Sequence, residues 1–197
     1  LSTMVSAFDS GKIDEMILPS VTVKYVTDNN DSYEIREMTA GNPIVPFSML
    51  LKYDNEDLRD EINAAMISLY DNKVDDELAK NMDDIEPVEF ETFEGAKTIT
   101  FAVTGDLPPM DYVSASGEPS GYNVRLISAL CKEMKVNPKI IQINSSARAM
   151  ALATNKADVV FWTKGQIDEA DIEAYAQRAK ETLESSDGQN DDGLKAF

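Results

Sequence analysis

Between residues 98 and 161, short apolar runs alternate with segments whose apolar residues recur at helical spacing, and this alternation constrains the fold most. Runs of strand length stand at 98–103, 139–143 and 158–161, separated by helical segments at 122–135 and 145–154. Strands that alternate with helices connect through right-handed crossovers and build a mostly parallel sheet. The sequence therefore predicts the α/β class, with helices flanking the sheet.

The start of the chain predicts a helix, a turn and a strand. Gly11 suits the end of the helix, and residues 13–18 read as a short strand. The turn GKID at 11–14 matches NKAD at 155–158, which also stands between a helical segment and an apolar run. We interpret the two units as a repeat. The first helix is indicated by four apolar residues: Leu1, Met4, Val5 and Phe8.

A strand and two helices are predicted next, at 47–52, 56–69 and 74–82. The longer helix carries a stripe predicted to be buried: Leu58, Ile62, Ala65, Met66 and Leu69. Residues 83–95 are acidic, contain a proline and lack a helical period, so we expect a linker with a domain boundary near residue 90. Residues 165–197 predict one amphipathic helix followed by a mobile acidic tail.

Composition excludes several kinds of chemistry. The 197 residues include no histidine, which excludes Ser-His-Asp and Cys-His catalysis and the usual zinc and non-haem iron sites. Cys131, the single cysteine, lies in an apolar-periodic run and is predicted to be a core residue. The formal net charge of −18 repels phosphate backbones, so no nucleic-acid partner is expected. The acidic cluster at 28–34 lacks the glycine of an EF-hand loop, so no metal or cofactor is predicted.

Polar and aromatic residues follow two of the predicted strands at the edge where open α/β sheets place their ligands. We predict six ligand-binding residues: Asp106, Asp111, Tyr112, Trp162, Thr163 and Lys164. A carboxylate can meet an ammonium group, a ring can cover an apolar face, and the lysine can meet a carboxylate. The alternatives are that Asp106 and Asp111 are ordinary turn residues and that the two aromatic rings serve packing.

The stretch TITFAVTGDLPPMDYVSASGEPSGYNVRLISAL, which begins at Thr98, resembles the opening of the family 3 extracellular solute-binding proteins, the amino-acid-binding components of ABC importers. In that family a strand leads into a proline-aromatic loop and then a "dG.l.Gfd.dl" pattern, which residues 116–126 follow. Asn123 and Arg125 replace the usual acids, and Met110 replaces an aromatic residue. The run ATNKADVVFWTKG is similar to the family's turn and ligand-facing strand end.

The first half resembles the end of the same family. PFSMLLKYDNEDLRDEINAAMISLYDNKVDDELAKNM is similar to its closing strand and helices, and LSTMVSAFDSGKIDEMILPSVTVKYV to the helix and strand before them. The order is therefore permuted, either because tandem domains have been cut or because residues 47–82 complete the sheet built by 98–163; we favour that packing. On this basis the domains are C-terminal-type elements at 1–82, a linker at 83–95, an N-terminal-type lobe at 96–164, and a helix and tail at 165–197.

The resemblance implies a lobe of the periplasmic-binding-protein-like type II fold that binds a small polar solute, an amino acid, without a catalytic step. It further implies a membrane permease of an ABC importer as partner, with a sensory or structural module as the alternative. Arg178 stands nearest the place of the family's carboxylate-binding arginine, but the segment that follows it there is missing. We expect an extracellular or periplasmic location, with a lipoprotein-like anchor in a segment before Leu1.

Overall fold

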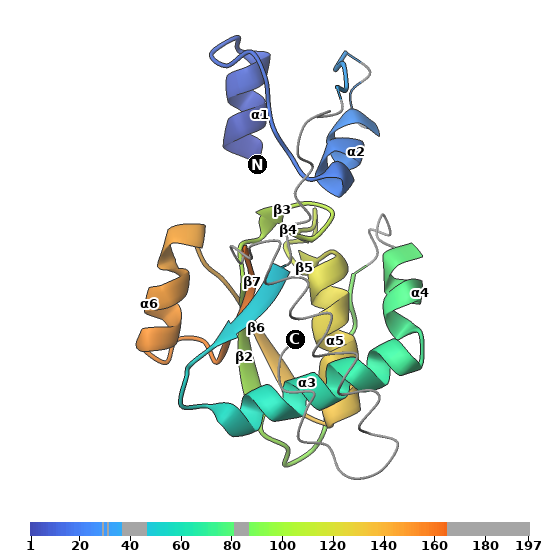
Figure 1. Ribbon diagram of the computed structural model, residues 1–197, viewed down its shortest axis with the longest axis vertical. Helices are drawn as coiled ribbons and strands as arrows, with labels where there is room; N and C mark the ends of the chain where they lie inside the picture. The colour runs from blue at the N-terminus through green and yellow to red at the C-terminus, as the bar shows by residue number, and fades with distance from the viewer. Residues whose placement is uncertain (29, 31, 37–46, 81–86, 165–197) are drawn as a thin grey trace, which may run out of the picture.

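A four-stranded sheet forms the centre of the protein in the computed structural model, which describes residues 1–28, 30, 32–36, 47–80 and 87–164 (Figure 1). The strand order is β1 (Phe47–Leu51), β7 (Val159–Lys164), β2 (Thr98–Val103) and β6 (Asn137–Gln142). β2 pairs in parallel with β6 and with β7, whereas β1 runs antiparallel to β7. The predicted α/β class with a mostly parallel sheet is confirmed.

Helices cover both faces of this sheet. α3 (Glu56–Asp71) and α5 (Tyr122–Met134) pack on one face together with α4 (Val74–Lys80), and α6 (Arg148–Ala153) packs on the other. The two faces follow the alternation of a strand, because Phe101 and Phe161 point into the α3–α5 core while Ala102 and Val160 point toward α6. The Phe101 and Phe161 rings meet edge to face, with their centroids 6.2 Å apart.

The first half of the chain completes the hydrophobic core of the second half. β1 pairs with β7 over the register Phe47–Lys164 to Leu51–Val159, and four of the five residues in the predicted stripe of α3 are buried beside α5. The fifth, Met66, is half-buried against the same core. The expected packing of residues 47–82 onto this sheet is confirmed as far as residue 80, where the described part of α4 ends. The boundary near residue 90 stays a prediction.

Residues 1–28 stand beyond the carboxyl end of the sheet as two helices, α1 (Ser2–Asp9) and α2 (Ser20–Asp28) (Figure 1). The strand predicted at 13–18 is wrong. A strand needs a neighbour to satisfy its backbone groups, and residues 13–18 pair with no strand in the described chain. Ile17 is accordingly 75% exposed.

The turn of the predicted repeat is present in both copies. In the first copy, the Gly11 N–H donates to the Phe8 carbonyl over 2.9 Å and the Lys12 N–H donates to the Ala7 carbonyl over 2.8 Å. The second copy repeats this pattern, with bonds of 3.1 Å and 2.8 Å from Asn155 and Lys156 to the Leu152 and Ala151 carbonyls. Gly11 and Asn155 both have a left-handed φ, +67° and +56°. The helix and turn therefore repeat, and only the second copy continues into a strand.

A small antiparallel sheet connects β2 to α5. Its strands are β3 (Asp106–Leu107), β4 (Asp111–Val113) and β5 (Pro119–Ser120). The short helix η1 (Ser145–Ala147) connects β6 to α6. Residues 87–95 form neither helix nor strand, and the helix and tail predicted for 165–197 lie outside the described residues. Within the described ranges, no helix is both long enough and apolar enough to cross a membrane.

Candidate functional site

The carboxyl ends of β2, β6 and β7 meet at one edge of the main sheet, which we call the carboxyl edge. Two described segments leave this edge: the β3–β5 sheet after β2, and η1 with α6 after β6. Parallel strands in open α/β sheets place their ligands beyond this edge. The α1–α2 unit, residues 1–28, lies over the same edge (Figure 1).

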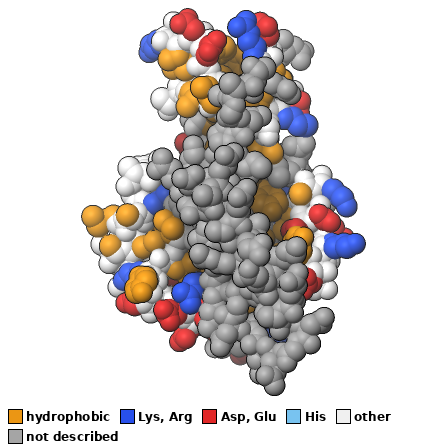
Figure 2. Space-filling model, in the orientation of Figure 1, with side chains coloured by type: hydrophobic (Ala, Val, Ile, Leu, Met, Phe, Trp, Pro, Cys, Tyr) orange, Lys and Arg blue, Asp and Glu red, His pale blue; other side chains and the backbone are white. Residues whose placement is uncertain are grey.

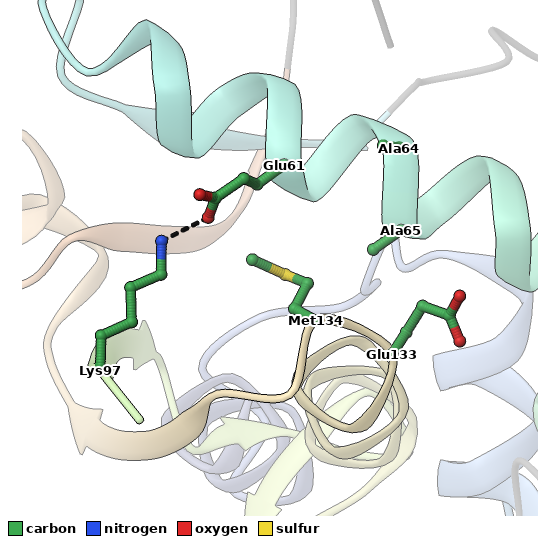
Figure 3. A pocket seen from close by; sticks show the side chains of 6 residues that line it. All are labelled: Glu61, Ala64, Ala65, Lys97, Glu133 and Met134. Atoms are coloured by element: carbon green, nitrogen blue, oxygen red, sulfur yellow. Dashed lines mark hydrogen bonds and ion pairs between the residues drawn. The ribbon is translucent and has the colours of Figure 1, made fainter. Parts of the chain in front are cut away.

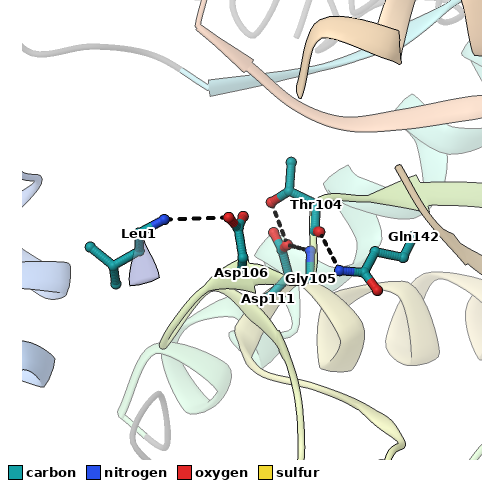
Figure 4. Close-up of polar contacts among 6 residues, drawn as sticks. All are labelled: Leu1, Thr104, Gly105, Asp106, Asp111 and Gln142. Carbon is teal, nitrogen blue, oxygen red and sulfur yellow. Dashed lines mark hydrogen bonds and ion pairs between the residues drawn. The ribbon is translucent and has the colours of Figure 1, made fainter. Parts of the chain in front are cut away.

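Asp111 is the polar centre of the loop after β2 (Figure 4). Its side chain is 2% exposed, and its carboxylate accepts hydrogen bonds from the Thr104 hydroxyl at 2.8 Å, the Gly105 N–H at 2.6 Å and the Asn123 amide at 2.7 Å. Three donors on one buried carboxylate leave little room for a ligand. The structure therefore gives Asp111 the role of tying the loop to the start of α5.

Close backbone contacts fix the same loop. Gly121 precedes α5 with φ +104°, and a Cβ there would lie 2.6 Å from the Met110 carbonyl oxygen. The Gln142 amide donates to the Thr104 carbonyl over 3.0 Å and lies where a Cβ of Gly105 would stand. Glycine is the residue that tolerates both the left-handed backbone and the close approach. The loop is thus held against both α5 and β6.

Asp106 and Tyr112 lie on the outer side of this loop. Asp106 is exposed on β3, and its carboxylate lies 3.3 Å from the terminal amine of Leu1 (Figure 4). The Tyr112 ring is half-buried on β4, and its centroid is 6.5 Å from that of Tyr25 on α2. Both side chains therefore lie on the side of the β3–β5 sheet that contacts the α1–α2 unit.

The other three predicted residues lie at the end of β7. Ser48 and Phe47 of β1 pair with Thr163 and Lys164, and Trp162 precedes them on the same strand. Their side chains are outside what the structure describes. The backbone nevertheless brings these residues and the Thr104–Tyr112 loop to the same edge of the sheet, as the strand pattern predicted.

The hollows on the described surface include two of different size. The smaller, of about 180 Å³, is at the carboxyl edge between the β3–β5 sheet and β6 and is lined by Tyr112, Pro119, Ile140 and Gln142, among others. The larger, of about 440 Å³, is at the opposite edge between α3 and α5 (Figure 3). There Glu61 and Lys97 form an ion pair, and Met134 stands between α3 and α5. Of these two, the smaller adjoins a predicted site residue, Tyr112.

Cys131 packs in the core, as predicted. It is 2% exposed, and burial raises the pKa of its thiol to about 12. The thiol is therefore neutral at physiological pH and does not act as a nucleophile. Among the residues that the structure describes, no three Asp, Glu or Cys side chains gather in a way that suits a metal ion. Asn29 and Asp31 of the acidic cluster lie outside them.

The described surface mixes charges of both signs. Figure 2 shows acidic and basic side chains around the α1–α2 unit and around α4, and hydrophobic side chains over α6. Met150 on α6 is 64% exposed. Among the described side chains that Figure 2 shows, basic and acidic groups are interspersed, and the basic ones form no stripe of the kind that nucleic acids bind.

Sequence reasoning missed two groups at the carboxyl edge. Thr104 and Asn123 hold the Asp111 carboxylate, and only the fold shows that they meet it. Arg148 begins α6 where the chain returns from the end of β6. The available signal was a cation at the start of a helix that follows a strand, which many surface helices share.

Comparisons with known proteins relate part of the chain to a known family. Residues 99–169 match the sequence profile of the "Bacterial extracellular solute-binding proteins, family 3". A crystal structure of a point mutant of the arginine-bound form of domain 1 from TmArgBP is similar at 24% identity and a TM-score of 0.33, covering 39% of this chain and 58% of that chain. This chain thus spans less than two thirds of that structure. No curated protein sequence matches.

Proposed function

We propose that this chain binds a small polar solute, an amino acid, at the carboxyl edge, because residues 99–169 match the profile of the family 3 extracellular solute-binding proteins, as their resemblance predicted. The single observation that carries the proposal is that residues 99–169 include all of β2 except Thr98, the whole of β6 and β7, and the segments that follow β2 and β6 at the carboxyl edge. Ligands of open α/β sheets bind at this edge.

The proposed site divides the work among the predicted residues. Asp106 is exposed, and we assign to its carboxylate the ligand's ammonium group. Tyr112 offers a ring face beside the 180 Å³ hollow. Trp162, Thr163 and Lys164 end β7 with a ring, a hydroxyl and an ammonium group for the rest of the ligand. Asp111 holds the loop in place and does not contact the ligand.

Binding of this kind needs no covalent step, and we infer a carrier protein and not an enzyme. The family's role implies delivery to the membrane permease of an ABC importer and a location outside the cytoplasmic membrane. In the sensory or structural alternative the solute binds at the same site, but the ligand-bound protein does not deliver the solute to a permease. Reconstitution with a permease distinguishes them, because a carrier raises the rate of solute uptake and a sensor does not.

The test uses the single tryptophan. Trp162 emission is followed while each of the twenty L-amino acids is added, and a thermal-shift assay and calorimetry are run on the same panel. We expect at least one amino acid to change the emission and to raise the melting temperature, since a ligand that binds only the folded state stabilises it.

Two matched variants show where binding occurs. Asp106→Asn weakens binding of that amino acid, because it removes the charge that meets the ammonium group. Asp76→Asn, which changes an exposed acid on α4, leaves affinity unchanged. A panel in which no amino acid alters emission, heat or melting temperature contradicts the proposed function, as does equal binding by wild type and Asp106→Asn.

A further inference from the structure

α2 lies against the β3–β5 sheet through one of its faces (Figure 1). The centroid of the Tyr25 ring is 6.5 Å from that of the Tyr112 ring on β4, and the two rings are tilted by 37°. Thr22 stands three residues before Tyr25, so both side chains share a face of the helix. The Thr22 side chain is fully buried. α2 therefore presents Thr22 and Tyr25 to the β3–β5 sheet.

The strand register identifies the residues of the sheet that share the face toward α2. Tyr112 pairs with Asp106 of β3 and with Ser120 of β5. Residues that stand directly opposite each other on antiparallel strands place their side chains on the same face of the sheet. Asp106, Tyr112 and Ser120 therefore form one row across the three strands, on the face that Tyr25 contacts.

Two hydroxyl groups at this contact lack hydrogen-bond partners. Oγ1 of Thr22 and Oγ of Ser120 are both buried, and neither bonds to any residue that the structure describes. By contrast, the Thr27 hydroxyl on the same helix donates to the Val23 carbonyl over 3.0 Å. Buried polar groups are nearly always hydrogen-bonded, and an exception calls for an explanation. Two exceptions on the facing sides of one contact indicate surfaces that also meet water.

The balance of interactions makes this contact a weak one. A hydroxyl that is buried without a partner loses its bonds to water and gains none in return. Separation of α2 from the sheet returns water to both hydroxyls. The tilted ring pair opposes separation, but the attraction between two such rings is modest. The contact is therefore suited to open and close, and differs in this from the apolar core below the sheet.

The row that α2 contacts is also the face to which the proposed function assigns the solute. Asp106 is assigned the ammonium group of the solute, and Tyr112 offers its ring. Because Tyr25 already lies against this ring, a solute that stacks on Tyr112 must take the place of Tyr25. Solute and α2 thus compete for the same part of the carboxyl edge.

We propose that α2 is an autoinhibitory cover of the carboxyl edge, held there by Tyr25 and displaced by the solute. The inference rests on the proposed function and adds its regulation. The apparent affinity of such a protein is its intrinsic affinity reduced by the fraction of molecules whose site is open. A change that loosens α2 therefore strengthens solute binding, and a change that tightens α2 weakens it.

The experiment measures solute affinity and the position of α2 separately. Affinity is measured by calorimetry for the wild type, Tyr25→Ala, Thr22→Val and the control Tyr70→Ala, which changes an exposed ring on α3. The position of α2 is followed at pH 8 by alkylation of the thiol in a Thr22→Cys variant, since the native Cys131 is buried and neutral. Ser10→Cys, at an exposed position of the α1–α2 unit, gives the rate for a free thiol.

We expect Tyr25→Ala to bind the amino acid about 3- to 10-fold more tightly, because loss of the ring contact leaves more molecules open. Thr22→Val should raise the melting temperature and weaken binding, because it removes a buried hydroxyl without a partner. Tyr70→Ala should bind like the wild type. The amino acid should speed alkylation of Thr22→Cys, and adding Tyr25→Ala to that variant should speed it without any amino acid.

The outcomes separate this inference from the proposed function. If the amino acid slows alkylation of Thr22→Cys, or if Tyr25→Ala weakens binding, then α2 helps to hold the solute and the inference is overturned. An alkylation rate that Tyr25→Ala leaves unchanged overturns it too, because the ring contact then does not hold α2. If no amino acid binds but Tyr25→Ala still speeds alkylation, the cover stands and the proposed solute class fails.

Discussion

Replacing Asp111 by alanine removes the acceptor that joins the loop after β2 to the start of α5. The carboxylate is 2% exposed and takes three hydrogen bonds of 2.6 to 2.8 Å, from Thr104, Gly105 and Asn123. The Thr104 hydroxyl can rotate toward another acceptor. The Gly105 N–H and the Asn123 amide are held by the backbone and by α5, so both donors are left stranded.

The magnitude follows from those two donors. A buried donor without an acceptor costs about 1–3 kcal/mol. Two of them, offset in part by relief of the buried carboxylate, make Asp111→Ala less stable by about 3 kcal/mol. In a chain of this size each kcal/mol lowers the melting temperature by about 2–4 °C, so the expected loss is about 6–12 °C. Asp106→Ala, on the exposed side of the same loop, should change stability by less than about 0.5 kcal/mol.

A swap separates the hydrogen-bonded pair from the mere presence of an acid. Asn123→Asp alone sets two carboxylates face to face where an amide met a carboxylate at 2.7 Å, and should destabilise the fold. Adding Asp111→Asn restores one acceptor and one donor across the contact. Thermal and urea unfolding of the single and double variants should therefore show at least half of the loss recovered. Losses that simply add in the double variant would refute the reasoning.

Three further outcomes follow from the structure. Gly121→Ala should lower the unfolding free energy by about 3 kcal/mol, because φ is +104° and a Cβ would lie 2.6 Å from a backbone oxygen. The control Gly117→Ala, with φ +86° but no atom within 4 Å of a Cβ, should cost about 1 kcal/mol, and equal costs would argue against the close approach. Cys131 should resist alkylation in the native state at pH 8 and react once unfolded. Its folded pKa of about 12 lies above the ordinary 9.0, so the stability that it contributes is present below pH 9 and is lost as pH rises toward 12; labelling of the folded protein at pH 8 would contradict this. Ile62→Ala should lower the unfolding free energy by about 2–5 kcal/mol and keep one cooperative transition, since this 3%-exposed side chain of the first half lies in the core of the second half. Ile17→Ala, at a 75%-exposed site, should leave stability nearly unchanged, and two separate transitions would contradict a shared core.

Elements with a strong local signal were predictable. The strand Thr98–Val103 is observed with the predicted bounds, and α5 ends one residue before the prediction at Met134. Both lie in runs whose apolar periodicity leaves a single face to bury. The strand predicted at 13–18 had a similar apolar content and is not formed. A strand depends on a partner elsewhere in the chain, which local pattern does not report.

The candidate site, too, was predictable in part from the sequence. The sequence places Asp106, Asp111 and Tyr112 on one loop and Trp162 at the end of a strand, and the sheet brings the two segments to a common edge. It does not distinguish Asp106 from Asp111, because both are acids near prolines in a turn. Burial makes that distinction, since one carboxylate is exposed and the other accepts three hydrogen bonds.

By itself, the sequence determined the α/β class, the absence of histidine chemistry and the relation of residues 99–169 to a solute-binding family, because periodicity, composition and motif are properties of the chain. Tertiary structure alone decided that β1 joins β7, that Asp111 supports the loop and that Arg148 stands without a partner among the described residues. These facts concern contacts between residues far apart in the chain, and only folding brings such residues within hydrogen-bonding distance.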